Sequence, residues 1–272
     1  MRAEDTPDAS KRSMRSVTDM SKLANIAHGA KNALRAVSGK EKFKRTSAII
    51  LAAGSSCRMG EIDKQFLELG GMPVIARTIK AFEDCDAIGE IVIVTKKESK
   101  AKLGELCKKY GFKKTKDIII GGDTRQDSAW NGLLAVDDKA EFIAVHDGAR
   151  CLITPEQIIN IAREAYRCGA ASAGTKSTDT VKLSENGFIA DSVDRDKVWL
   201  AQTPQIFNAN LYRAASYTAN EAKFKATDDC MLAERIKFNT IKLVDCGKYN
   251  MKITTPDDII LAEAIIASRN KS

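Results

Sequence analysis

The stretch AIILAAGSSCRMGEIDKQ, from Ala48 to Gln65, predicts a buried strand that runs directly into a loop of small residues. Two cations, Arg58 and Lys64, lie in or just after this loop. A strand that ends in this way presents backbone N–H groups beside positive charge, which suits a polyphosphate. The run from Gly54 to Gly60 is also compatible with a tight turn alone, but the neighbouring cations favour phosphate binding.

Outward from this stretch, short β-branched runs alternate with helical patterns. That alternation is typical of an α/β fold, in which a mostly parallel sheet has helices on both faces. Strands are predicted at Ala48–Ala53, Glu90–Thr95, Asp117–Ile120, Phe142–His146, Ala170–Thr175 and Thr240–Val244. Helices are predicted at Pro73–Glu83, Ser99–Tyr110, Ser128–Val136, Pro155–Cys168, Asn210–Asn220, Asp228–Ile236 and Pro256–Ala267. At Thr154-Pro155 and Thr255-Pro256 a hydroxyl cap precedes proline, which marks two of these starts.

The region from Thr180 to Trp199 breaks this alternation. It predicts a β-hairpin in which Glu185-Asn186-Gly187 turns between Val181–Leu183 and Phe188–Val193. We expect the hairpin to project as an arm over about residues 180–199. Its apolar residues then need a partner surface, and the expected partner is a second copy of the chain in a homodimer.

The net charge of +7 is concentrated before the first predicted strand. Residues 1–45 contain 11 Lys or Arg and 5 Asp or Glu, a net +6, which leaves +1 for residues 46–272. The nearly neutral body therefore gives no sign of a nucleic-acid partner. We divide the chain into a basic extension, residues 1–45, and a folded domain, residues 46–272.

The extension predicts one amphipathic helix after a cap at Ser21, because its apolar residues recur at helical spacing at Leu23, Ile26, Ala30, Leu34 and Val37. A tail outside the fold, a contact with a membrane surface or partner, and an organelle-targeting peptide are three interpretations that stay open. The five acidic residues count against targeting.

Composition narrows the class of protein further. No apolar run approaches the roughly 18 residues of a membrane span, and the leading residues lack a secretory h-region, so a cytoplasmic protein is expected. The seven cysteines are scattered and never form a C-x-x-C pair, which argues against a zinc site or a disulfide framework.

Three predicted strands are followed by segments that carry chemistry: Ala52–Lys64, Gly121–Arg125 and His146–Arg150. Ligands of open parallel sheets bind beyond the carboxyl ends of the strands, so these segments are expected to converge on one site. The expected convergence of three segments is stronger evidence for a binding site than any single motif. Neither a G-x-G-x-x-G dinucleotide fingerprint nor a complete P-loop is present, which disfavours an oxidoreductase.

For three features of these segments, Gly121-Gly122, Asp147 and His146, a structural role is the alternative to a functional one. Gly121-Gly122 could only end a strand, or together with the polar residues that follow could hold a base or ribose. Asp147 stands where a carboxylate can hold Mg²⁺ beside a triphosphate, for which one carboxylate is enough; the alternative is a salt bridge to Arg150. His146 could be a general base, but a phosphate nucleophile needs none, which favours a structural histidine.

Taken together, these residues resemble the 2-C-methyl-D-erythritol 4-phosphate cytidylyltransferase family. The resemblance covers about residues 46–268, in order and with familiar spacing. It rests on Ala48–Gly54, Arg58-Met59-Gly60, Lys64-Gln65-Phe66, Gly121-Gly122 with Arg125 and Ser128, Val145-His146-Asp147 with Arg150, Asp179–Lys182, Gln202–Phe207, Thr227–Asp229 and Asn250–Pro256.

The resemblance implies a Rossmann-like homodimer that joins CTP to methylerythritol phosphate and releases pyrophosphate in non-mevalonate isoprenoid biosynthesis, with Mg²⁺ as cofactor. It implies catalytic roles for Arg58, Lys64 and Lys252, and Asp147 as the metal ligand. The implied cytidine pocket consists of Ala52, Ala53, Gly54, Gly122, Asp123 and Ser128. Implied contacts to the sugar phosphate are Arg150, Arg195, Thr203 and Thr227, besides Lys252, and Arg195 on the arm is expected to reach the other subunit's site.

Two other functions remain as alternatives. A ribitol 5-phosphate cytidylyltransferase would have a similar CTP half, although Asp179–Lys182 and Ala226-Thr227-Asp228 favour methylerythritol phosphate. A non-catalytic nucleotide-binding module would keep the fold without turnover. Retention of Arg58, Lys64, Asp147 and Lys252 argues against that module, because a pure binder has little need of all four.

Overall fold

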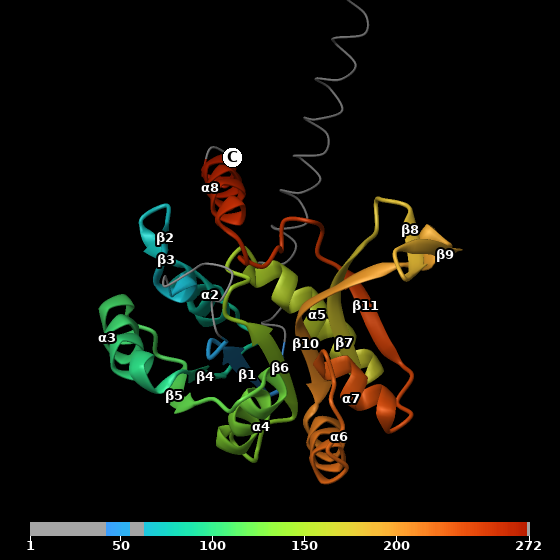
Figure 1. Cartoon of the computed structure of the whole chain (residues 1–272). Helices are drawn as coiled ribbons and strands as arrows, with labels where there is room; N and C mark the ends of the chain where they lie inside the picture. The colour runs from blue at the N-terminus through green and yellow to red at the C-terminus, as the bar shows by residue number, and fades with distance from the viewer. Residues whose placement is uncertain (1–41, 55–62, 271–272) are drawn as a thin grey trace, which may run out of the picture. The chain divides into compact units, whose positions relative to one another are not determined.

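A seven-stranded sheet forms the centre of the computed structural model, which describes residues 42–54 and 63–270 (Figure 1). The strand order is β11 (Ile241–Asp245), β7 (Ala170–Lys176), β10 (Trp199–Asn208), β6 (Phe142–Asp147), β1 (Thr46–Leu51), β4 (Glu90–Thr95) and β5 (Thr115–Ile120). Only β10 runs antiparallel to its neighbours within this sheet. The α/β, mostly parallel class predicted from the sequence is therefore confirmed.

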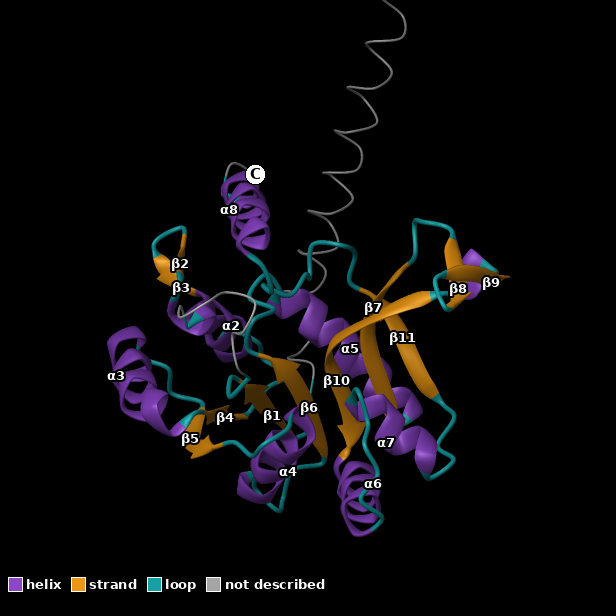
Figure 2. Ribbon diagram, viewed as in Figure 1, coloured by secondary structure: helices purple, strands orange, loops and turns teal. Residues whose placement is uncertain are grey.

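Helices cover both faces of the sheet (Figure 2). One face packs against α2 (Val74–Glu83), α3 (Lys100–Tyr110) and α5 (Pro155–Cys168), and the other against α4 (Arg125–Ala135), α6 (Ala209–Glu221) and α7 (Asp229–Arg235). Strand β1 shows why two layers form: Ala48 and Ile50 enter the first core, while Ile49 and Leu51 enter the second. Side chains alternate across a strand, so an uninterrupted apolar run must be buried on both faces.

Helix α8 (Pro256–Arg269) packs in a third, smaller cluster with Leu69, Val74 and Leu152. A short hairpin of β2 (Glu68–Leu69) and β3 (Met72–Pro73) contributes to the same cluster. The short 3-10 helices are η2 (Lys64–Phe66), η3 (Lys97–Ser99) and η4 (Arg195–Lys197). Among the described helices, none is both long and apolar enough to cross a membrane.

The helix starts follow the capping signals. Helices α5 and α8 begin at Pro155 and Pro256, as predicted. Helix α4 begins at Arg125 rather than at the predicted Ser128, because Thr124 and Asp127 form a capping box that starts the helix earlier. The earlier start places Arg125 in the first turn of the helix, close to the carboxyl end of the sheet.

Strand β10 was not among the predicted strands. Its residues WLAQTPQIFN include Pro204, which has no N–H for the ladder, and its pairing with β7 shifts register between Ala201 and Gln205. The strand nevertheless lies in the middle of the sheet, between β6 and β7. Tertiary contacts on both sides therefore override a weak local strand pattern.

The predicted hairpin is present as β8 (Val181–Glu185) and β9 (Phe188–Val193), which form a separate two-stranded sheet. Positive φ angles at Asn186 (50°) and Gly187 (84°) suit the tight turn between the strands. The hairpin lies away from the helices that cover the main sheet (Figure 1). Its apolar Phe188 and Ile189 are 78% and 70% exposed.

Residues Phe43–Ser272 make up one compact unit. The amphipathic helix predicted between Ser21 and Val37 lies outside the described residues, so the division into residues 1–45 and 46–272 stays a prediction. Arg58 and the rest of segment 55–62 also lie outside them.

Candidate functional site

Several chain segments meet at the carboxyl end of the parallel strands. The N–H of Gly148 donates to the carbonyl of Leu51 (2.8 Å), and the N–H of Gly121 donates to the carbonyl of Thr95 (2.9 Å). These bonds join the turns that follow β5 and β6 to the ends of β4 and β1. The described parts of the segments after these strands therefore lie at one edge of the sheet, as the register of a parallel sheet requires, and their role as one site stays a prediction.

The turn after β5 packs tightly against the turn after β1. A Cβ atom on Gly121 would lie 2.5 Å from the Cβ of Ala53 and 2.6 Å from the Oγ of Ser128. The N–H of Gly122 donates to that same Oγ (3.2 Å). The structure thus brings together Ala53, Gly122 and Ser128 of the predicted nucleotide pocket.

The other three residues of that predicted pocket lie beside these. Ala52 is buried at the end of β1, and Gly54 is exposed two residues later. Asp123 is exposed directly after Gly122, and no hydrogen bond or ion pair of its side chain is found among the described residues. At this part of the sheet edge, the backbone of Gly54 and the carboxylate of Asp123 are therefore exposed.

From the predicted nucleotide pocket we expect the Gly121→Ala variant to bind nucleotide poorly, because the added methyl cannot fit between Ala53 and Ser128. The two turns must separate, and overpacking of this kind typically costs about 1–3 kcal/mol. We expect a lower free energy of unfolding by urea and a raised KM for CTP. Gly111→Ala is an informative contrast, since its Cβ has open space but its φ of +68° strains the backbone away from the site. Equal changes in KM for CTP in both variants would contradict the assignment.

The carboxylate of Asp147 lies at the centre of a cluster of cations. Its oxygens accept from Arg125 Nε (3.1 Å) and Lys252 Nζ (2.9 Å), and Arg150 Nε lies 3.7 Å away. Burial alone would raise the pKa of Asp147, but the charges of Arg125 and Lys252 hold it well below its usual range. Three cations face this carboxylate and Asp229, which pairs with Arg125, so positive charge is still in excess, which suits a polyanionic ligand.

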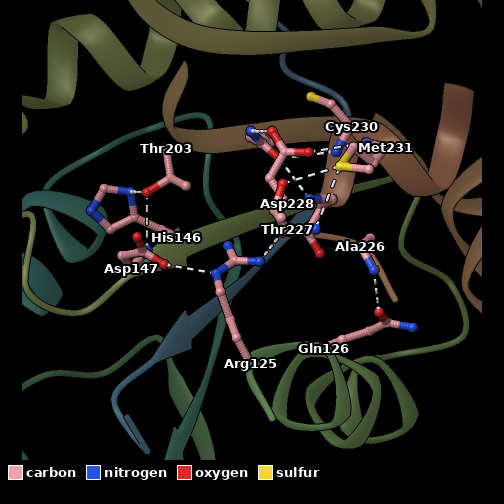
Figure 3. Close-up of polar contacts among 12 residues, drawn as sticks. Arg125, Gln126, His146, Asp147, Thr203, Ala226, Thr227, Asp228, Cys230 and Met231 are labelled. Carbon is pink, nitrogen blue, oxygen red and sulfur yellow. Dashed lines mark hydrogen bonds and ion pairs between the residues drawn. The ribbon is translucent and has the colours of Figure 1, made fainter. Parts of the chain in front are cut away.

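Arg125 itself bridges two carboxylates. Figure 3 shows its bond to Asp147. Its guanidinium also donates to Asp229 (2.8 Å), whose other oxygen accepts from the hydroxyl of Tyr212 (2.6 Å). Asp229 is buried, so Arg125 is held in one orientation. The sequence analysis gave Arg125 no role of its own. Its position after a predicted strand, beside Gly121-Gly122, was the signal for it.

His146 is a buried, neutral histidine. Its Nε2 lies 3.2 Å from the carbonyl of Arg150, which can only accept, so the ring proton belongs on Nε2. Nδ1 then accepts from the hydroxyl of Thr203 (3.0 Å), and that hydroxyl in turn accepts from the N–H of Asp147 (3.0 Å). Burial lowers the pKa of His146 to about 3. These contacts favour the structural interpretation of His146 and show that Thr203 fixes the backbone of Asp147.

The pH dependence of stability should show this neutral histidine. The folded pKa lies below the unfolded value of about 6.5, so the unfolded chain alone takes up a proton as the pH falls. The stabilisation is therefore present above pH 6.5 and is lost as the pH falls towards 3. In urea unfolding between pH 6 and pH 4, His146→Gln should lose about 1.4 kcal/mol per pH unit less than the wild type. Parallel stability curves for the two proteins would contradict a neutral His146.

Asn250 anchors the segment that carries Lys252. Its carbonyl accepts from Arg150 Nη1 (2.9 Å), and its buried Nδ2 donates to the carbonyl of Thr203 (2.9 Å) and to Gln202 Oε1 (2.9 Å). Lys252 follows two residues later and points its Nζ at Asp147. Asn250 and Gln202 were not predicted as site residues, and only the fold reveals that they join this segment to β10.

Lys64 and Thr227 approach the site from other directions. Lys64 is buried in η2, and the next residue, Gln65, has its Oε1 3.1 Å from where a Cβ of Gly148 would lie, close to Asp147. Thr227 is exposed just before α7, two residues from Asp229. Both residues are thus neighbours in sequence of groups that lie near Asp147 or Arg125, and their own contacts with a ligand stay predictions.

Arg195 lies elsewhere. It is exposed on η4, beyond the hairpin, and its Nη1 donates to the carbonyl of Thr178 (3.2 Å). Among the described residues, no hydrogen bond or ion pair connects it to the Asp147 cluster. Within a single subunit, Arg195 is thus separate from the other predicted contacts to the sugar phosphate.

The donor set at Asp147 fits a magnesium ion only together with a ligand that supplies oxygens. The described residues include no group of three His, Cys, Asp or Glu side chains that could hold a metal. Mg²⁺ commonly takes one or two carboxylates, phosphate oxygens and waters, and Asp147 provides one carboxylate at the sheet edge. A bound triphosphate can also take over its cationic partners and release that carboxylate.

Such an edge on a mostly parallel sheet is typical of the α/β proteins that bind nucleotides beyond the carboxyl ends of their strands. The family model described as "IspD: 2-C-methyl-D-erythritol 4-phosphate cytidylyltransferase" matches residues 46–268. The chain therefore belongs to this family.

Individual relatives show the same resemblance over most of their length. The 2-C-methyl-D-erythritol 4-phosphate cytidylyltransferase of Caldanaerobacter subterraneus subsp. tengcongensis is 41% identical over 223 residues, which cover 81% of this chain and 98% of the relative. That of Pelodictyon phaeoclathratiforme is 42% identical, with 82% and 97% covered. The crystal structure of 4-diphosphocytidyl-2C-methyl-D-erythritol synthase from Anaerococcus prevotii superposes with a TM-score of 0.74 at 33% identity, covering 82% of this chain and 96% of that one.

Proposed function

We propose that this protein transfers the cytidylyl group of CTP to 2-C-methyl-D-erythritol 4-phosphate, giving 4-diphosphocytidyl-2-C-methyl-D-erythritol and pyrophosphate in non-mevalonate isoprenoid biosynthesis. Family membership supports the substrates. The observation that carries the chemistry is the group of three cations, Arg125, Arg150 and Lys252, around Asp147 at the carboxyl edge of the sheet. Two polyanions that repel each other need such a positive surface to meet.

The reaction is an in-line displacement. A phosphate oxygen of methylerythritol phosphate attacks the α-phosphorus of CTP, the new P–O bond forms, and the bond to the pyrophosphate leaving group breaks. We assign Arg58 and Lys64 to neutralise the triphosphate and the charge that develops in the transition state. No general base is required, because the attacking phosphate is already ionised, and this agrees with the neutral, buried His146.

For cytidine, we assign a pocket formed by the turns after β1 and β5. The close packing of Ala53, Gly121 and Ser128 supports it, since the two turns meet there without room for a side chain at Gly121. Backbone N–H and carbonyl groups can read the edge of a base in such a pocket. Its residues are Ala52, Ala53, Gly54, Gly122, Asp123 and Ser128.

The acceptor side is assigned to Arg150, Thr203, Thr227 and Lys252, with Arg195 from the partner subunit's arm. Arg150 is supported by its buried Nε, which makes no hydrogen bond among the described residues and lies 3.7 Å from Asp147. The hydroxyl of Thr203 already bonds to His146 and to the N–H of Asp147. These bonds support a role for Thr203 in positioning Asp147. Direct contact of Thr203 with the sugar phosphate stays a prediction.

Asp147 is assigned to hold Mg²⁺ together with phosphate oxygens of CTP. The metal supplies further neutralisation of the phosphates. The chain's own contribution is to keep the carboxylate ionised and oriented, through the cations beside it and the bond from its N–H to Thr203.

We assign the arm to homodimer formation. The exposed Leu183, Phe188 and Ile189 support this, because three large apolar side chains on one hairpin need cover. Sedimentation of a Phe188→Ser, Ile189→Ser variant should show a monomer where the wild type is a dimer. The cytoplasmic location and the role of residues 1–45 stay predictions.

The test of the proposed function is pyrophosphate release from CTP by the full chain, with and without Mg²⁺. Parallel reactions contain 2-C-methyl-D-erythritol 4-phosphate, ribitol 5-phosphate or no acceptor. Release that requires methylerythritol phosphate supports the proposal. Release only with ribitol phosphate would keep the chemistry and change the substrate, whereas CTP binding without release would identify a non-catalytic module.

A further inference from the structure

In the first turn of α4, the side chain of Gln126 forms hydrogen bonds with main chain that is distant in the sequence; we call this pair of bonds the clamp. The Nε2 of Gln126 donates to the carbonyl of Phe224 (3.0 Å), and the N–H of Ala226 donates to the Oε1 of Gln126 (2.9 Å). One amide thus bonds to both sides of a segment about 100 positions away in the sequence. Figure 3 shows the second of these bonds, between Ala226 and Gln126.

The segment that Gln126 holds, residues 222–228, forms neither helix nor strand. It connects the end of α6 at Glu221 to the start of α7 at Asp229. Residue Thr227 directly follows the clamped Ala226, and its hydroxyl makes a weak contact with Met231 Sδ (3.0 Å). Phe224 and Ala226 also pack partly buried against the core, and Asp228, which follows Thr227, accepts from Gln205 Nε2 (2.9 Å). The clamp is thus the contact with α4 among those that place Thr227.

Arg125, the neighbour of Gln126, holds the other end of the same segment. Its Nη1 donates to the buried Asp229, two residues beyond Thr227, while its Nε donates to Asp147. Thr227 is therefore fixed on one side by Gln126 and on the other by Arg125. Both side chains lie in the first turn of α4, shortly after the nucleotide turn, Gly121-Gly122.

We propose that Gln126 is a positioning residue that sets the acceptor-binding Thr227 in register with Asp147 and the nucleotide turn. The inference rests on the proposed assignment of Thr227 to the sugar phosphate. The clamp acts on the acceptor side alone, because the main chain that it holds is not part of the nucleotide turns. Loss of the clamp therefore affects binding of one substrate and spares the other.

The main test is Gln126→Met, which keeps the length and helix propensity of the side chain but removes both bonds. We expect KM for methylerythritol phosphate to rise about tenfold, in line with the loss of one to two net hydrogen bonds, while KM for CTP changes less than about twofold. The matched control is Asn131→Leu on the same helix, whose Nδ2 donates to the carbonyl of Ile120 and not to the acceptor segment. We expect it to leave KM for methylerythritol phosphate unchanged, and any effect to fall on KM for CTP, because Ile120 directly precedes the nucleotide turn.

A second variant keeps the test decisive if Gln126→Met folds poorly in thermal unfolding. Gln126→Glu retains an acceptor for the Ala226 N–H but places a carboxylate against the carbonyl of Phe224, so it should also raise KM for the acceptor. Hydrogen exchange in peptides that span residues 222–230 should quicken in both variants and not in Asn131→Leu.

A double-mutant cycle separates this inference from the assignment on which it rests. If Gln126 acts through Thr227, Gln126→Met should add little to Thr227→Val. The inference would be overturned if the effects of Gln126→Met and Thr227→Val on the acceptor KM multiplied in the double variant. It would also be overturned if Gln126→Met raised both KM values equally or left the acceptor KM unchanged. An unchanged acceptor KM in Thr227→Val would instead overturn the assignment of Thr227.

Discussion

Replacing Lys64 by alanine is expected to lower kcat by roughly 10²–10³ while the protein stays folded. The ammonium group is assigned to the triphosphate, where negative charge accumulates as the bond to pyrophosphate breaks. Lys64 lies in η2, directly before Gln65, whose side chain approaches the turn that follows Asp147. Because the interaction strengthens in the transition state, kcat should fall more than KM rises.

The matched control for this prediction is Lys102→Ala. Lys102 is an exposed lysine of α3 whose Nζ lies 4.1 Å from the centre of the Phe66 ring, so it neighbours the same short helix without a role in the site. Its loss should leave kcat unchanged in steady-state assays of pyrophosphate release. We expect Arg58→Ala to resemble Lys64→Ala, and near-normal turnover in both would defeat the assignment of these two cations.

Replacing Asp147 by asparagine is expected to have the second large effect, a loss of kcat of about 10²–10³, with a protein less stable by about 3 kcal/mol. Removing the charge leaves Arg125, Arg150 and Lys252 without their shared carboxylate. The same change should tighten CTP binding when no divalent cation is present, because the carboxylate no longer competes with the triphosphate for these cations.

Three measurements check this prediction: steady-state rates over a range of Mg²⁺ concentrations, calorimetric CTP binding in EDTA, and urea unfolding. Asp84→Asn is the control, since Asp84 pairs with Lys80 (2.8 Å) on the exposed end of α2, away from the site. A surface pair of this kind contributes little, so the three readouts should barely change. Wild-type turnover by Asp147→Asn, with unchanged dependence on Mg²⁺, would rule out Asp147 as the metal ligand.

The two halves of the site differ in how far local sequence predicted them. The turns after β1, β5 and β6 were found from sequence because each follows a short apolar strand, and parallel register brings such turns to one edge. The helix starts at Pro155 and Pro256 were also predicted from local sequence, because the hydroxyl cap and the proline act within one helical turn. Arg125 lay within a recognised motif, but its two carboxylate partners could not be inferred from spacing.

Strand β10 shows where local reasoning stopped. Its pattern is interrupted by Pro204 and polar residues, and it becomes a strand only because β6 and β7 bond to it on both sides. The burial of Thr203, and with it the bond to His146, depends on that placement. The contacts of Asn250 with Gln202 and Thr203 were hidden for the same reason.

The sequence by itself determined the α/β class, the arm, the family and the residues that carry charge, because periodicity, capping and motif order are local properties of the chain. The tertiary structure decided which charges meet: Asp147 with Arg125 and Lys252, and Gln126 with the segment before Thr227. These pairs lie between 22 and 105 positions apart. Contacts across such separations arise only once the strands have paired and the helices have packed, so spacing in the sequence cannot reveal them.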